Sequence, residues 1–242
     1  MLVLLSPSKT LRYIPLQTDA VTQPFFLKKT KQLVQELAAY SKKDIQTLMH
    51  VSERIAEKTV NDHRAIHFPF TKKNAMPAIS LFQGHVFQHI HVASYSPSDL
   101  AFAQKTLRIL SGLYGILRPL DLMQPYRLEM RYRVKEWKDL LTAYIADAGQ
   151  PVINLASKEY ASAIDFDAVN VPVYTVVFKE KKGDTYSIIR LYAKYARGRM
   201  AHWIIKNNIT DPERIKDFSE DGYHYTPALS NTHEFVFTRA TT

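Results

Sequence analysis

The sequence predicts an α+β fold, a mixed α/β arrangement in one compact domain that spans residues 1–242. Patterns typical of helices and of strands interleave along the chain, with no repeat, low-complexity tract or Gly/Ser-rich linker between them. Hydrophobic residues make up 46% of the chain, which is ample for a buried core. Because no composition shift marks a boundary, a single domain is the simplest arrangement.

The first third of the chain predicts one strand and two helices. The apolar run Leu2–Leu5 ends at a Ser-Pro-Ser-Lys turn, as a buried strand does. Apolar residues then follow mostly helical spacing from Pro24 to about Tyr40, and again from Asp44 to Lys58.

Residues 78–92 predict a pair of strands that turn at a Gln-Gly step. On the second strand, His85, His89 and His91 would share one face. A metal site is one interpretation of this face. An exposed strand face is favoured, because no acidic ligand lies nearby in the sequence, and we assign no metal.

The next segment predicts a helix, because Ser96 is a good N-cap and Pro97 suits the first helical position. Its apolar stripe consists of Leu100, Ala103, Leu107 and Leu110. The helix is expected to end in a turn at Gly112 and Gly115. This glycine turn resembles a helix-hairpin-helix whose N–H groups face a phosphate, although its glycine spacing is looser, and a helix C-cap is the commoner explanation.

The second half predicts a helix over Glu136–Ala148 followed by a strand in "PVINLA". Two β-rich runs, "VNVPVYTVVF" and "TYSIIRLY", are joined by a Lys-Gly-Asp turn. A helix from about Ala193 to Asn207 and a final strand in "EFVFTR" complete the chain.

The composition narrows the classes of function. A net charge of +9, from 32 Lys and Arg against 23 Asp and Glu, favours a polyanionic or phosphate-bearing partner. The chain has no Cys, which excludes disulfides, thiolate zinc sites and cysteine nucleophiles. The apolar run after Met1 is too short for a signal peptide and no stretch is long enough to span a membrane, so we expect a cytoplasmic protein.

Two groups of charged residues are candidates for a site. Lys194 and Arg197 lie near the predicted start of a helix, half inward, where the helix dipole disfavours cations. Either an acidic neighbour such as Asp121 or Glu129 offsets them, or a bound phosphate or carboxylate does. The two carboxylates, with Arg118 and Arg127 beside them in the sequence, form either an acid/base site or a buried ion network. No Walker loop, dinucleotide fingerprint or G-x-S-x-G motif accompanies them.

Five segments, "LLSPSKTL", "LRILSGLYGILRPLDLMQPYRLEM", "VINLASKEY", "YAKYARGRMAHWII" and the closing "GYHY" with "FVFTR", resemble the YaaA family of peroxide stress proteins. The resemblance covers nearly the whole chain. It implies a mixed α/β domain with a basic cleft, a helix-hairpin-helix-like element, DNA binding without strong sequence preference, and a role in limiting oxidative DNA damage and intracellular iron. This chain has Arg131 where the family usually has Gly, and a shortened segment follows it.

The family's recurring positions correspond here to Ser6, Pro7, Lys9, Thr10, Gly112, Gly115, Arg118, Asp121, Tyr126, Arg127, Glu129, Asn154, Ser157, Tyr160, Lys194, Arg197, Gly198 and Met200. From these we predict the DNA- or anion-binding residues Lys9, Thr10, Gly112, Gly115, Arg118, Arg127, Asn154, Lys194 and Arg197. The leading hypothesis is a monomer, without a cofactor, that binds double-stranded DNA through its phosphates. The alternative is an enzyme acting on a nucleotide, nucleobase or other small anion, with Asp121 or Glu129 as its base; binding without catalysis is favoured.

Overall fold

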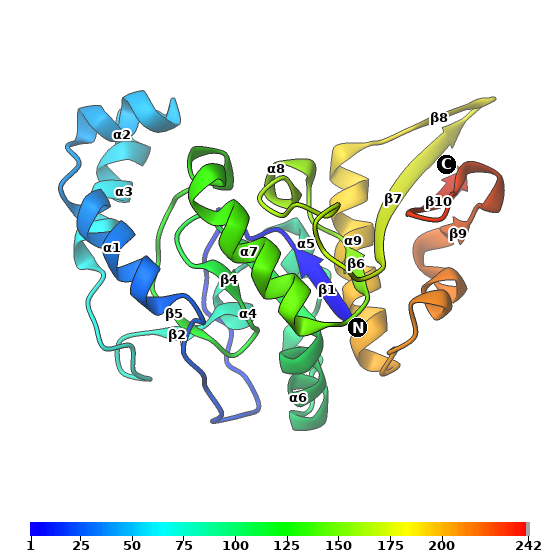
Figure 1. The fold of residues 1–242 in the computed structure, drawn as a ribbon, viewed down its shortest axis with the longest axis horizontal. Helices are drawn as coiled ribbons and strands as arrows, with labels where there is room; N and C mark the ends of the chain where they lie inside the picture. The colour runs from blue at the N-terminus through cyan, green and yellow to red at the C-terminus, as the bar shows by residue number, and fades with distance from the viewer. Residues whose placement is uncertain (241–242) are drawn as a thin grey trace.

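A largely parallel sheet forms the centre of the computed structural model, which describes residues 1–240 (Figure 1). Its strands lie in the order β4-β3-β1-β6-β7-β10-β9, and β8 pairs with β7. Their bounds are β1 (Leu2–Leu5), β3 (Leu107–Ser111), β4 (Gly115–Leu117), β6 (Val152–Asn154), β7 (Val173–Lys182), β8 (Thr185–Ser187), β9 (His224–Tyr225) and β10 (Glu234–Ala240). All four residues of β1 are buried, as a central parallel strand with both faces covered requires.

Helices surround this sheet. They are α1 (Leu27–Ala38), α2 (Lys42–Met49), α3 (Glu53–Ala65), α4 (Ala78–Leu81), α5 (His85–Gln88), α6 (Pro97–Thr106), α7 (Val134–Ala148), α8 (Lys158–Ala161) and α9 (Arg190–Lys206). Short 3-10 helices cover Val92–Ser94, Met130–Tyr132, Pro212–Asp217, Glu220–Gly222 and Pro227–Leu229, and a separate ribbon pairs β2 (Met76–Pro77) with β5 (Leu122–Met123). The mixed α/β fold in a single compact domain is confirmed.

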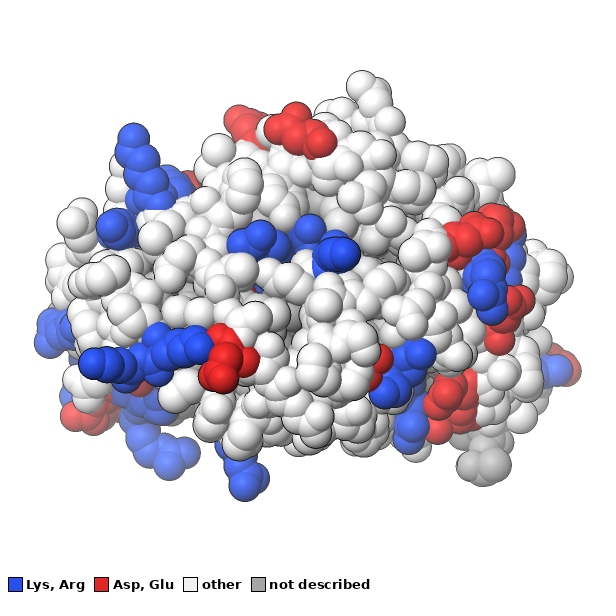
Figure 2. Space-filling model, turned by 90° about the horizontal axis from the view of Figure 1, so that it is seen from below, with Lys and Arg blue, Asp and Glu red and all other residues white. Residues whose placement is uncertain are grey.

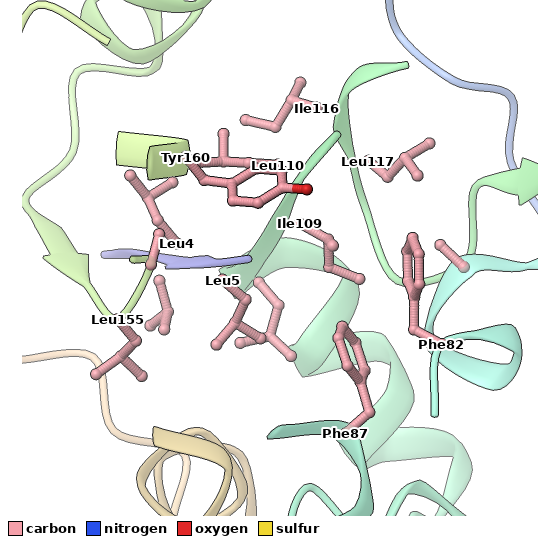
Figure 3. Close-up of a cluster of buried hydrophobic side chains, with 14 of the residues drawn as sticks. Leu4, Leu5, Phe82, Phe87, Ile109, Leu110, Ile116, Leu117, Leu155 and Tyr160 are labelled. Atoms are coloured by element: carbon pink, nitrogen blue, oxygen red, sulfur yellow. The ribbon is translucent and has the colours of Figure 1, made fainter. Parts of the chain in front are cut away.

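The helices are arranged in layers around the sheet. Helices α6 and α9 pack against each other and against β1 and β7, whereas α7 packs on β4 and crosses in front of the sheet in Figure 1. Helix α3 contacts both α1 and α2, and the three helices form a group at the left of that view. The core between these layers includes Leu4, Leu5, Ile109, Leu110, Leu155, Phe82 and Phe87 (Figure 3).

Most predicted elements are confirmed, with the boundaries moved. Helix α6 begins as predicted, with Pro97 at its first turn and a capping box in which Ser96 Oγ accepts from the Asp99 N–H. The predicted helix over residues 44–58 is wrong as a single element, because the chain breaks at His50, whose left-handed φ of 49° ends α2.

Two predicted elements are wrong. The helix does not continue to the glycine turn: Leu107 and Leu110 lie on β3, which forms an antiparallel hairpin with β4. Helix α6 ends at Thr106, and Gly112 and Gly115 belong to this β-hairpin, so within residues 1–240 the segment forms no helix-hairpin-helix. The predicted strand pair over residues 78–92 is instead the short helices α4 and α5 and a 3-10 turn.

Within residues 1–240, no helix combines the length and the apolar character that crossing a membrane requires.

Candidate functional site

The carboxyl ends of β1 and β6 mark the point where the connections of the sheet diverge. From β1 the chain leads to β3 on one side, and from β6 it leads to β7 on the other. In open parallel sheets such a switch point leaves a crevice at the carboxyl edge, where ligands bind. Here the two loops are joined by Ser6, whose Oγ donates to Ser157 Oγ (3.2 Å) and accepts from the Ser157 N–H (2.9 Å).

A buried carboxylate lies beside this edge. Glu129 is only 3% exposed, and its Oε1 pairs with Lys9 Nζ (2.6 Å) and with an Arg127 guanidinium nitrogen (3.4 Å). Its second oxygen, Oε2, and the Nε of Arg127 are buried without a hydrogen-bond partner in the described structure. Glu129 is thus buried and paired, as the ion-network alternative requires, and its Oε2 can accept from one more donor.

A cleft of ≈ 460 Å³ adjoins this ion pair. Its walls come from the segment after β1, from α3 and from residues 125–127. Among its lining residues are five cations and one carboxylate: Lys9, Arg12, Arg54, Lys58, Arg127 and Asp62. Lys58 pairs with Asp62 (2.6 Å), whereas no ion pair within residues 1–240 holds Arg12 or Arg54. The exposed ring of Tyr13 also lines the cleft, which is therefore basic with an aromatic wall, a composition suited to nucleic acid or a phosphate.

His63 connects two walls of this cleft. Its side chain is buried on α3, and its Nε2 lies 3.0 Å from the carbonyl oxygen of Arg127, which accepts a hydrogen bond when Nε2 is protonated. Burial lowers the pKa of His63, because the charged imidazolium is poorly solvated there. The neutral ring thus fixes Arg127 beside α3.

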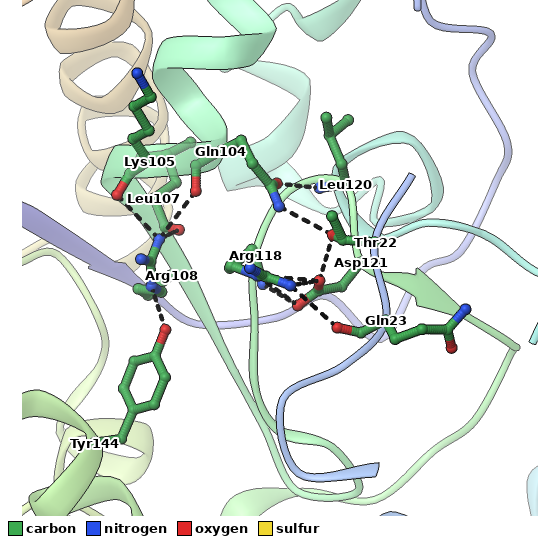
Figure 4. A network of polar contacts seen from close by, with 10 residues as sticks. All are labelled: Thr22, Gln23, Gln104, Lys105, Leu107, Arg108, Arg118, Leu120, Asp121 and Tyr144. Carbon is green, nitrogen blue, oxygen red and sulfur yellow. Dashed lines mark hydrogen bonds and ion pairs between the residues drawn. The ribbon is translucent and has the colours of Figure 1, made fainter. Parts of the chain in front are cut away.

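Asp121 and Arg118 form a separate network away from Glu129 (Figure 4). The carboxylate of Asp121 is fully buried and accepts from the Arg118 guanidinium (2.9 Å), the Arg118 backbone N–H (2.7 Å) and Thr22 Oγ1 (2.6 Å). Arg118 also donates to the carbonyl of Gln23 (3.2 Å). These contacts fix the loop after β4 to the chain before α1, so Asp121 serves as an ion-network residue, the second of the two alternatives drawn from the sequence.

The two glycines predicted to contact DNA are buried in the β3–β4 hairpin. A side chain at Gly112 would collide with the backbone of Leu128 and Glu129, and Gly115 has a φ of +71° beneath the ring of Trp137. The carbonyl of Gly112 accepts from Trp137 Nε1 (2.8 Å). Both glycines therefore have a packing role, and direct contact with DNA would require the covering residues to move.

Asn154 and Thr10 lie at the carboxyl edge of the sheet, Asn154 as the last residue of β6 and Thr10 in the loop after β1. Asn154 is buried at the end of β6, where its amide oxygen accepts from the Ala156 N–H (3.0 Å) and its amide nitrogen donates to Thr175 Oγ1 (3.3 Å). Thr10 is exposed, and its N–H donates to Ser8 Oγ (3.0 Å). Asn154 therefore shapes the loop that presents Ser157, and Thr10 belongs to the turn that presents Lys9.

Lys194 and Arg197 lie on α9 and are not among the lining residues of the cleft. The helix begins at Arg190, earlier than predicted, so neither residue lies in its first turn. Lys194 is exposed, whereas Arg197 is half-buried with an Nε that has no partner in the described structure. Burial lowers the pKa of Arg197. No ion pair within residues 1–240 joins either residue to Asp121 or Glu129.

The three histidines lie around α5 and not on a strand. His85 is the first residue of this short helix and His89 follows its last residue, and the ring of His89 stacks on Tyr195 of α9 (4.3 Å between centroids). His91 has a left-handed φ of 50°. In the described part of the chain, no group of three or more His, Cys, Asp or Glu side chains is placed to hold a metal ion.

Sequence reasoning missed four residues of the cleft, Arg12, Tyr13, Arg54 and Lys58. The first two follow the predicted Lys9 and Thr10 after one intervening residue, and Arg54 and Lys58 have the i,i+4 spacing that places two side chains on one helix face. These signals were present, but nothing in the local sequence shows that α3 packs beside the chain after β1.

Figure 2 shows basic side chains near the centre and over the left half of one face of the molecule.

A family model and several related proteins match nearly the whole chain. Residues 1–229 match the family described as peroxide stress protein YaaA. The chain is 40% identical to a UPF0246 protein of Acaryochloris marina, with 99% of this chain and 100% of that protein covered. It is 41% identical to a UPF0246 protein of Hahella chejuensis (99% of both chains) and 40% identical to one of Aliivibrio fischeri (99% of this chain and 98% of that protein).

Proposed function

Because the chain belongs to the peroxide stress protein YaaA family, we propose that it binds duplex DNA through phosphate contacts, with little sequence preference, and limits iron-dependent damage during peroxide stress. The observation that carries the DNA-binding part is the cleft beside Glu129, where five cations meet one carboxylate. Cations gathered in this way bind a phosphate backbone and release its counterions.

Two residues of the cleft are the natural contacts. Arg12 and Arg54 are exposed and free of ion pairs within residues 1–240, so binding a phosphate breaks no existing contact. Lys9 is 56% exposed, so its ammonium, which pairs with Glu129 Oε1 (2.6 Å), also faces the solvent from which a phosphate would approach. The ring of Tyr13 offers an apolar surface for a sugar or an exposed base.

The test is the salt dependence of binding, measured by fluorescence anisotropy on two duplexes of unrelated sequence. The variant Arg12→Ala/Arg54→Ala is expected to weaken both duplexes alike and to flatten the slope of log K against log salt by about one to two units. The matched control is Lys28→Ala/Lys135→Ala, which removes the same charge from exposed positions outside the cleft. An equal change of slope in both variants would show that net charge alone, and not the cleft, drives binding.

One observation favours a second candidate function. The unpaired Oε2 of Glu129 is a buried carboxylate oxygen beside a cationic pair, and a general base in an enzyme acting on a small anion would have this environment. In that case nucleotides or nucleobases raise the melting temperature of the wild type, and DNA has no measurable affinity at physiological salt. Glu129→Gln would then remove turnover while leaving the thermal shift in place.

A further inference from the structure

The β7–β8 arm, residues 176–191, carries a group of exposed apolar side chains that the cleft does not use. Among the described residues, most side chains of this size are buried, yet Tyr186, Ile188, Ile189 and Leu191 are all exposed within six positions, Ile188 to 55%. Every residue from 181 to 191 is exposed. Contiguous exposed apolar groups on a projecting element mark an interaction site.

The arm extends the β7–β10 side of the sheet beyond β6 at the same edge as the cleft, and β10 pairs with it as far as Lys181. Strand β6 pairs with β7 only as far as Thr175, and β7 continues through residues 176–182, which at about 3.3 Å per residue carries it about 23 Å further. Strand β8 returns from the tip across a turn at Gly183, whose φ is +59°. Figure 1 shows this pair rising from the upper right of the molecule. Lys9 follows the carboxyl end of β1, two strands away in the sheet.

Basic residues surround the apolar ones. Lys181 and Tyr186 are cross-strand partners on one face, with Lys181 Nζ 5.9 Å from the centre of the Tyr186 ring, and Lys179 shares that face two residues away. The arm and the start of α9 also contribute Lys182, Arg190 and Lys194.

Few carboxylates lie within this segment of the sequence. Glu180 is buried and bonded to Arg239 Nε (2.8 Å) and to the Tyr223 hydroxyl, which leaves Asp184 as the one exposed carboxylate between residues 179 and 195. The arm therefore presents mostly positive charge around its apolar side chains.

We propose that the β7–β8 arm is a second DNA-contacting element, in which the basic side chains hold the phosphates and Ile188 and Ile189 press against base pairs from the minor groove and bend the duplex. This inference rests on the proposed DNA binding. Proteins that bend DNA from the minor groove insert apolar side chains between base pairs and hold the DNA with basic residues beside them.

Two features favour DNA as the partner: the positive charge of the arm, and its position at the same edge of the sheet as Lys9. A polyanion that crosses the carboxyl edge of the sheet meets both the arm and Lys9, and DNA is long enough to contact both. A second copy of the chain is disfavoured, because its arm would bring a like charge and because β8 has only three residues with lysines opposite, a poor edge for strand pairing.

The experiment uses the full chain and a 30-base-pair duplex with a donor and an acceptor dye at its ends. Wild type is expected to bind and to raise energy transfer by bending the duplex. Ile188→Ala/Ile189→Ala is expected to abolish most of the bend and to weaken binding by about tenfold. Both side chains are exposed, so the melting temperature should stay within a few degrees of wild type. The matched control is Leu140→Ala, an exposed apolar residue on α7, which should bend DNA as wild type does.

Each other outcome has a definite meaning. If wild type binds and the isoleucine variant binds and bends equally well, the arm proposal is overturned and the proposed function stands. If wild type binds no duplex, the proposed function itself fails. If wild type binds vesicles of phosphatidylserine and phosphatidylcholine, and only that binding is lost in the variant, the arm is a membrane-contacting element and the DNA role is overturned.

Discussion

Replacing Glu129 by Gln tests whether the buried carboxylate restrains the cations of the cleft. Glutamine has nearly the same volume, so the change leaves no cavity, but it removes the charge that holds Lys9 at 2.6 Å and Arg127 at 3.4 Å. Lys9 is 56% exposed and is expected to turn outward, whereas the more buried Arg127 stays beside α3 through the carbonyl contact to His63. One cation is thereby released toward a bound phosphate.

The magnitude follows from counterion release. One additional phosphate contact steepens the slope of log K against log salt by about 0.9, which is about an eightfold gain in affinity at 0.1 M relative to 1 M salt. Folding stability changes in the opposite sense. The pair with Lys9 is screened by solvent and contributes at most about 1 kcal/mol, and loss of the more buried contact to Arg127 adds about 1–2 kcal/mol.

The assay therefore pairs anisotropy titrations at several salt concentrations with urea denaturation. We expect tighter DNA binding from a less stable protein, a combination that general unfolding does not produce. Lys9→Ala is the matched control, because it removes the same ion pair without releasing a cation and should weaken binding. Weaker binding by Glu129→Gln, in a variant that folds normally, would refute the idea that Glu129 restrains Lys9.

Three further predictions concern stability. Burial lowers the pKa of His63 below its unfolded value, so the unfolded chain binds more protons than the folded one. The folding stability therefore falls as the pH drops through about 6.5, by up to about 1.4 kcal/mol per pH unit. In the variant His63→Gln, urea midpoints measured between pH 7 and pH 5 should lose this pH dependence. Gly198→Ala should destabilise the fold by about 3 kcal/mol or more, because the added methyl meets the Val86 carbonyl where α5 packs on α9, and calorimetry should show a lower melting temperature. Asp121→Asn should cost about 2–3 kcal/mol in urea denaturation, since it leaves Arg118 without its carboxylate.

The strands were predictable where only a buried strand could remove an apolar run from water. The run Leu2–Leu5 is too short for a helix and ends in a turn, so a buried strand follows. The segment from Leu107 to Ser111 is different, because four of its five side chains are buried and a fully buried strand shows no alternation. With Leu107 and Leu110 three residues apart, its pattern fits a helix equally well, and pairing with β1 decides the outcome.

The sequence predicted that the candidate site would contain a paired carboxylate, but it did not predict which cation would pair with it. A carboxylate in a segment this apolar must be paired if it is buried, and Glu129 is. Its main partner, Lys9, lies 120 positions earlier, at the end of β1, and only the sheet brings the two together. For the same reason Arg54 was missed: its place in the cleft depends on how α3 packs, which no local pattern contains.

The division of charge in this protein bears on how a polyanion would bind. The buried carboxylates Asp121 and Glu129 already hold cations, and these ion pairs fix loops. The excess positive charge lies instead on side chains such as Arg12 and Arg54, which form no ion pair within residues 1–240, and on the β7–β8 arm. A phosphate backbone that reaches Arg12 and Arg54 displaces water and counterions but breaks no ion pair within residues 1–240, so the barrier to association there is small. Binding should consequently be fast at low salt and slow steeply as salt rises, with the association rate carrying much of that dependence.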